Sequence, residues 1–107
     1  MDFRQQWALA CAQVPDLRQV IRDQRMKVCE AYCISPEDAL DELARASLRL
    51  TEHVVAGGLS HRAAFDPLQE VAENLGLVDR WFGQDAVQEA IAYGPRCYAA
   101  LTWERAA

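Results

Sequence analysis

The sequence contains few residues that break regular structure and no long apolar run. Glycine and proline together account for nine of its 107 residues, and about half of the chain is apolar. This composition excludes collagen-like, low-complexity and disordered proteins. No apolar run approaches the roughly 18 residues that a transmembrane helix needs, and the first residues lack the basic and apolar regions of a secretory leader. We therefore expect a globular, cytoplasmic protein with no membrane partner.

Sequence motifs of common enzymes are missing as well. The chain contains no G-x-x-x-x-G-K-[ST] phosphate loop, no G-x-G-x-x-G dinucleotide fingerprint and no G-x-S-x-G nucleophile elbow. No motif pairs either histidine with a nucleophile. We therefore expect a protein that is not an enzyme, with no catalytic residues and no cofactor.

Patterns typical of β-strands are also missing, because no segment alternates apolar and polar residues and the β-branched residues are scattered. Apolar residues recur instead at the spacings of three and four that mark one face of a helix. The predicted helices cover residues 2–13, 15–33, 36–56, 67–75, 84–93 and 95–105. The sequence thus predicts an all-α fold: a compact bundle of five or six helices with short loops, forming a single helical domain over residues 1–107.

Four short motifs set the predicted helix boundaries. Ser35-Pro36 combines an N-cap serine with a proline at the first helical position, and Asp66-Pro67 repeats this pattern later in the chain. Gly57-Gly58 is expected to end the third helix, because glycine reaches the left-handed conformation that closes a helix. Gly94-Pro95 is expected to end one helix and to begin the last.

Two of the four cysteines, Cys29 and Cys33, are four residues apart and so lie on one face of a predicted helix. Tetrahedral zinc would need two more ligands, and the only histidines, His53 and His61, are spaced more widely than in a zinc finger. We therefore predict no metal site and interpret the pair as reduced thiols packed in the core. A thiol or zinc site at Cys29 and Cys33 remains the alternative. The other cysteines, also expected in the core, are Cys11 and Cys97.

Negative charge exceeds positive charge, with 16 acidic and 11 basic side chains and a net charge of -5. The first 27 residues hold five basic and three acidic groups, whereas the rest of the chain holds six and thirteen. Because nucleic-acid affinity comes largely from neutralised phosphates, we expect no direct nucleic-acid partner. The one basic cluster is interpreted as a solvated helix face; its members are Arg18, Arg22, Arg25 and Lys27.

Two groups of residues are candidates for a protein interface. The first is an acidic run at the start of the third helix, although a solvated helix end is the simpler interpretation because Arg45 can pair with part of it. The second is an adjacent aromatic pair beside Gly83. Its side chains point about 100° apart on a helix, so one of them can stay at the surface as a binding anchor. The candidate residues are Glu37, Asp38, Asp41, Glu42, Trp81 and Phe82.

The prediction for function is a small acidic, non-enzymatic protein-binding module, either an adaptor or an inhibitor. Its partner is expected to be another protein with a basic surface, because the acidic helix starts would steer it there. This class includes bacterial and phage-encoded inhibitors of nucleic-acid-binding machines. One alternative is a homo-oligomeric structural helical module, such as a homodimer, whose seam would be Leu40, Leu43, Leu50 and Val54. The other alternative is the thiol or zinc site.

Overall fold

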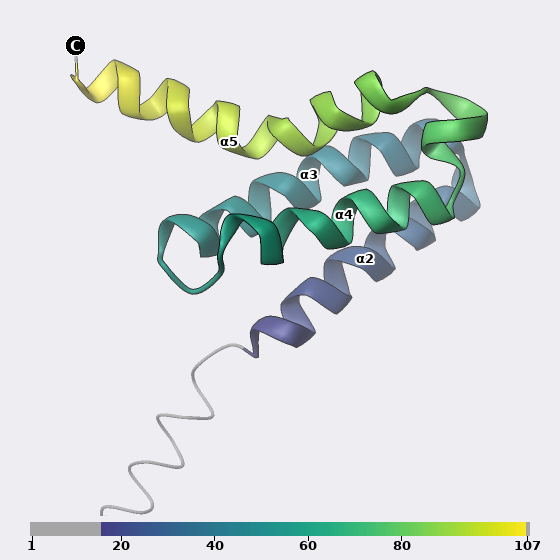
Figure 1. Ribbon diagram of the computed structural model, residues 1–107, viewed down its shortest axis with the longest axis horizontal. Helices are drawn as coiled ribbons and strands as arrows, with labels where there is room; N and C mark the ends of the chain where they lie inside the picture. Colours follow the sequence, from purple (N-terminus) through teal and green to yellow (C-terminus); the bar gives the residue numbers. More distant parts are fainter. Residues whose placement is uncertain (1–15, 107) are drawn as a thin grey trace, which may run out of the picture.

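The computed structural model describes residues 16–106, with the side chains of residues 16–100. No β-strand occurs in this range. The elements are α2 (Leu17–Ile34), α3 (Pro36–Val55), α4 (His61–Asn74), the π-helical turn η1 (Leu77–Trp81) and α5 (Gln84–Ala106). The predicted all-α bundle is therefore confirmed for this part of the chain (Figure 1). The helix expected over residues 2–13 and Cys11 lie outside the described residues.

α3 is the central helix of the bundle, since the two most extensive helix–helix contacts are those that it makes with α5 and α2. Ser35 alone separates α2 from α3, and residues 56–60 connect α3 to α4. Short connections of this kind make successive helices antiparallel neighbours. As a result, the α2–α3 junction and η1 lie at one end of the bundle, and the α3–α4 connection lies at the other (Figure 1).

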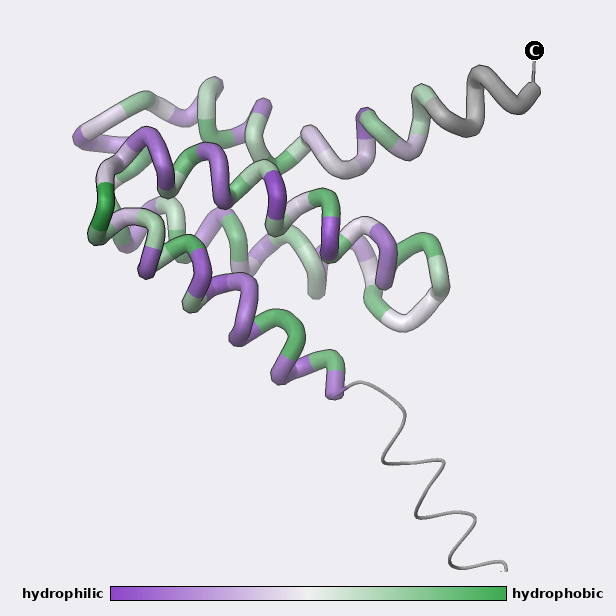
Figure 2. The backbone as a smooth tube through the Cα atoms, turned by 180° about the vertical axis from the view of Figure 1, so that it is seen from behind, coloured by the Kyte–Doolittle hydropathy of each residue, from purple (hydrophilic) through white to green (hydrophobic). Residues whose placement is uncertain are grey.

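The core is built from one apolar stripe on each helix. Leu43 and Leu50 of α3, Leu68 of α4 and Val87 of α5 have no exposed surface. Burying each of these side chains contributes about 1.5–3 kcal/mol. Figure 2 shows hydrophobic and hydrophilic residues alternating turn by turn along the helices, as amphipathic helices require. The other core residues are Val28, Ala39, Ala46, Ala64, Phe65, Val71, Ala72, Leu77 and Ala90.

The leucine stripe of α3 belongs to this intramolecular core. Leu43 and Leu50 are fully buried, and Leu40 and Val54 pack against the core at the edge of the stripe. Leu43 and Leu50 cannot also form a seam with a second copy, because other helices of the same chain already cover them, whereas Leu40 and Val54 keep part of their surface exposed. A homo-oligomeric module would therefore need a different interface from the one that the sequence suggested.

The predicted boundary between α2 and α3 is confirmed. Ser35 Oγ accepts a hydrogen bond from the Asp38 backbone N–H at 3.0 Å, and the Ser35 N–H donates to the Ala31 carbonyl at 3.1 Å. One residue thus serves both the end of α2 and the start of α3. The start of α2 differs slightly from its prediction. Asp16 is its N-cap and accepts a hydrogen bond from the Arg18 N–H at 3.0 Å.

The predicted helix start at Asp66-Pro67 is wrong. α4 begins earlier, directly after its N-cap Ser60, which accepts a hydrogen bond from the Ala63 N–H at 3.1 Å. Pro67 lies inside the helix and leaves the Ala63 carbonyl without its helical donor, but Ala63 is exposed to water. The turn before the proline also buries Phe65. The longer helix is therefore stabilised by the Ser60 cap and by the tertiary burial of Phe65, neither of which the Asp66-Pro67 pattern includes.

The predicted break at Gly94-Pro95 is wrong as well, because α5 runs through both residues. Proline removes the N–H that would bond to the Ile91 carbonyl. The Ser47 hydroxyl of α3 donates a hydrogen bond to that carbonyl and accepts one from the Gly94 N–H at 3.1 Å. Because Ser47 is fully buried, it gives these polar groups a partner inside the contact between α3 and α5, where water has little access.

Gly94 also lets α5 approach α3 closely. A Cβ at this position would overlap Thr51 Oγ1 and the backbone carbonyl of Ser47. Thr51 in turn donates a hydrogen bond to the Ser47 carbonyl at 2.7 Å. We call Ser47, Thr51, Gly94 and Pro95 the α3–α5 joint. Figure 1 shows that α5 changes direction part-way along its length, as helices commonly do at an internal proline.

Ser47→Ala is expected to lower the free energy of unfolding by about 1–3 kcal/mol, because it leaves the Ile91 carbonyl of α5, which Pro95 deprives of its helical donor, without a partner. In a Pro95→Ala background, residue 95 regains an N–H for the Ile91 carbonyl, so the same serine substitution should cost less. Urea denaturation of the four proteins in this double-mutant cycle measures the difference. Equal costs in the two backgrounds would show that the serine does not compensate for the proline.

Candidate functional site

The tryptophan candidate is held at the surface by the turn η1. The Trp81 N–H donates to the Gly76 carbonyl at 3.1 Å, and the Phe82 N–H donates to the Leu77 carbonyl at 2.9 Å. Gly76 precedes the turn with a φ of 77°, a left-handed conformation that favours glycine. Leu77 is fully buried, whereas Trp81 is 46% exposed. Phe82 packs partly buried against the core, so Trp81 is the member of the aromatic pair that is open to a partner.

Trp81 is fixed against the last turn of α2. Its ring N–H donates to the Tyr32 hydroxyl at 3.2 Å, and the Arg80 guanidinium lies 5.6 Å from its ring centroid. Ile34, two residues beyond Tyr32, is 78% exposed. An aromatic and an aliphatic side chain are therefore exposed at the end of the bundle where α2, α3 and η1 meet (Figure 1).

Three of the four acidic candidates lie at the start of α3, at this same end of the bundle. Glu37 and Asp38 occupy its first turn, and Asp41 follows one turn later. Glu37 and Asp41 are exposed, and none of the three forms a salt bridge within residues 16–100. We call the whole surface the Trp81 end and define it as Tyr32, Ile34, Glu37, Asp38, Asp41 and Trp81.

Glu42 differs from the other acidic candidates because two arginines pair with it. Its carboxylate accepts hydrogen bonds from Arg49 at 2.7 Å and from Arg45 at 3.3 Å. Arg49 also donates to Gln24 of α2 at 2.9 Å, so this group joins α2 to α3. Burial raises the pKa of Glu42, but the hydrogen bonds from Arg49 and Arg45 outweigh it, and the pKa lies below its ordinary value of 4.5. Glu42 therefore acts as a structural contact and is not part of the Trp81 end.

Glu42 is expected to make stability depend on pH in the acidic range. Because its pKa is lower in the folded chain, its contribution is fully present above 4.5 and is lost as the pH falls through the folded-state value. Glu42→Gln should destabilise the protein by about 0.2–1 kcal/mol at neutral pH, and by less in acid. Urea denaturation of both proteins at neutral pH and well below 4.5 provides the measurement. A gap that stays constant on acidification would contradict the ion-pair assignment.

The prediction that Cys29 and Cys33 pack in the core is wrong, because both thiols are exposed. Val28 is a buried position of α2 and Tyr32 packs partly buried against the core. Each cysteine comes one residue after one of these positions, which turns it about 100° toward solvent. Neither histidine completes a metal site with the pair, since residues 16–100 contain no group of three or more metal-binding side chains. Cys97 is partly buried.

Cys29 and Cys33 are expected to react with a thiol reagent in the native protein, because access is a first requirement for thiol reactivity. Brief alkylation followed by mass spectrometry should find both residues modified before the partly buried Cys97. Cys97 serves as the internal control, and denaturant should accelerate its modification most. Protection of Cys29 and Cys33 until the protein unfolds would contradict their exposure.

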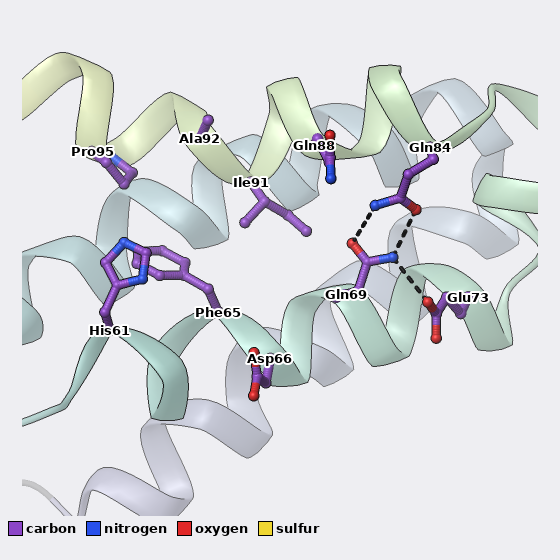
Figure 3. A pocket seen from close by; sticks show the side chains of 10 residues that line it. All are labelled: His61, Phe65, Asp66, Gln69, Glu73, Gln84, Gln88, Ile91, Ala92 and Pro95. Atoms are coloured by element: carbon purple, nitrogen blue, oxygen red, sulfur yellow. Dashed lines mark hydrogen bonds between the residues drawn. The ribbon is translucent and has the colours of Figure 1, made fainter.

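α4 and α5 border an open groove of about 590 Å³ (Figure 3). At one end, Gln69 and Gln84 exchange two amide hydrogen bonds of 2.9 and 3.2 Å, and Gln69 also donates to Glu73 at 3.0 Å. Toward the other end, Phe65 and Ile91 provide apolar surface between the helices. The groove is therefore amide-rich at one end and apolar at the other.

Sequence reasoning did not find this groove. Its α4 wall contains His61, Phe65, Gln69 and Glu73, a row at the four-residue spacing of one helix face. That spacing is visible in the sequence, but the predicted helix start at Asp66-Pro67 divides the row in two. The pairing of this row with α5 depends on the tertiary fold and has no local signal.

No family model, curated protein or solved structure matches the chain. Within residues 16–106, none of the helices has both the length and the apolar character of a membrane span. The chemistry of the Trp81 end and of the groove is therefore the basis for assigning a function.

Proposed function

We propose that this chain is a small, non-enzymatic protein-binding module that engages a basic protein surface through the Trp81 end. The observation that carries the proposal is the state of Trp81, which is about half exposed and yet held by a hydrogen bond to Tyr32. Ile34 and the acidic start of α3 lie at the same end of the bundle.

Trp81 has the properties of a binding anchor. Tryptophan is enriched among the residues that dominate binding energy, because its ring buries a large area when a partner covers it. Its contact with Tyr32 holds the ring in place before a partner arrives, so less side-chain entropy is lost on association. Ile34 adds an exposed aliphatic group that a partner can cover.

The acidic residues of the Trp81 end select the charge of the partner. Glu37 and Asp41 are exposed and have no salt-bridge partner within the described side chains. Complementary charge of this kind raises the association rate and disfavours acidic competitors. A basic surface that normally binds nucleic acid would suit it, which favours an adaptor or inhibitor acting on such a protein in the cytoplasm.

Trp81→Ala is expected to weaken partner binding by about 2 kcal/mol or more, or roughly thirty-fold. The tagged protein would first be used to isolate a partner from its source cell, with the partner identified by mass spectrometry. Titration of the purified partner then compares the wild type with Trp81→Ala. The matched control is Tyr93→Ala, because Tyr93 is 47% exposed but lies on α5.

Charge substitutions test the electrostatic part of the same proposal. Glu37→Gln combined with Asp41→Asn should slow association, and the effect should fade at high salt. Glu52→Gln combined with Glu89→Gln removes the same charge from exposed positions of α3 and α5 outside the Trp81 end and should change the rate less. A partner that binds wild type and Trp81→Ala equally well would contradict the proposed interface.

A further inference from the structure

The groove between α4 and α5 has the form of a site for a third helix. Its α4 wall is a row at four-residue spacing from His61 to Glu73, and its α5 wall runs from Gln84 through Gln88 and Ile91 to Pro95. A row of 12 residue steps rises about 18 Å along a helix axis, which equals more than three helical turns. A groove of this length and openness fits one face of a peptide helix better than it fits a compact small molecule.

The surface of the groove changes character along this length. At one end the apolar surface comes mainly from the partly exposed Ile91, and Phe65, which is 6% exposed, lies at the floor with the His61 ring centroid 4.5 Å from its own. Figure 3 shows Ile91 pointing from α5 toward α4 beside them. At the other end the reciprocal pair of Gln69 and Gln84 links the two walls. An occupant would therefore place bulky apolar groups against Phe65 and Ile91.

The charge of the groove selects a basic occupant. Two carboxylates line it, Asp66 and Glu73, and no lysine or arginine among the described side chains does. Asp66 forms a salt bridge with Arg62 at 3.8 Å, in which both side chains are largely exposed. A salt bridge this exposed contributes little free energy, so it neutralises the Asp66 charge only weakly. Glu73 accepts a hydrogen bond from the neutral amide of Gln69 and forms no salt bridge with the side chains of residues 16–100.

We propose that this groove binds a basic amphipathic helix of a partner protein. The apolar face of that helix lies against Phe65 and Ile91, and its basic side chains approach Asp66 and Glu73. The site lies on other residues than the Trp81 end, so this proposal does not depend on the proposed function and can fail separately from it.

A fluorescently labelled 14-residue leucine–lysine peptide, with leucine at spacings of three and four, tests the proposal. Fluorescence anisotropy should show saturable one-to-one binding to the whole chain and no comparable binding of a leucine–glutamate peptide. Asp66→Asn combined with Glu73→Gln should weaken binding about three- to ten-fold. Glu37→Gln combined with Asp41→Asn removes the same charge from the Trp81 end and should leave the affinity within about two-fold.

Gln88 is an exposed residue of the groove at which either a negative or a positive charge can be introduced. Gln88→Glu should strengthen binding of the lysine peptide, and Gln88→Lys should weaken it, with no change expected in folding. Amide chemical shifts should move around Phe65, Gln69 and Ile91 on addition of the peptide. Trp81→Ala should bind the peptide like the wild type.

Four outcomes of the peptide experiments with the groove variants and the control variants would overturn the proposal. They are the absence of saturable binding, equal binding of the leucine–glutamate peptide, equal weakening by the two charge pairs, and shift changes confined to other surfaces. Loss of peptide binding in Trp81→Ala would assign the peptide to the Trp81 end and would likewise exclude the groove.

Discussion

The arrangement of α3 and α5 depends on the hydroxyl group of Ser47. It is one of the few polar groups in the core, and it meets the two backbone groups of α5 that Gly94 and Pro95 bring there. Without this hydroxyl, the carbonyl left by the proline would be buried without a donor. With it, α5 can continue past two helix-breaking residues and lie close against α3. The same segment of α5 then forms one wall of the groove.

Much of the fold could be predicted from local sequence signals. The two helix boundaries that were predicted wrongly share one physical cause. Ser35 caps α3 as its sequence context indicates, because the cap and the proline act within one turn. Pro67 and Pro95 predict breaks that do not occur. In each case tertiary contacts outweigh the local preference: burial of Phe65 for α4, and the Ser47 hydroxyl for α5. Such contacts join residues that are distant in the chain, so propensity alone could not reveal them.

The candidate surfaces were less predictable than the helices. Trp81 and the acidic start of α3 could be named from the sequence, but the contact between Tyr32 and Trp81 joins residues 49 positions apart. Cys29 was predicted to be buried but is exposed. It follows the buried Val28 by one residue, and one residue along a helix turns a side chain by about 100°. The apolar pattern of such a segment predicts that it is helical, but it defines which face is buried only to within about 100° of rotation about the helix axis.

The distribution of acidic residues shows why net charge alone describes this protein poorly. Glu42 belongs to the same sequence run as Glu37 and Asp41, yet its charge is balanced by Arg45 and Arg49 and links α2 to α3. Its neighbours have no such partners among the described residues and remain available at the surface. An acidic side chain held by two arginines contributes little to the field that a partner meets, since opposite charges a few ångströms apart cancel at a distance. The charge that can select a partner is therefore set by which acids the fold leaves unpaired.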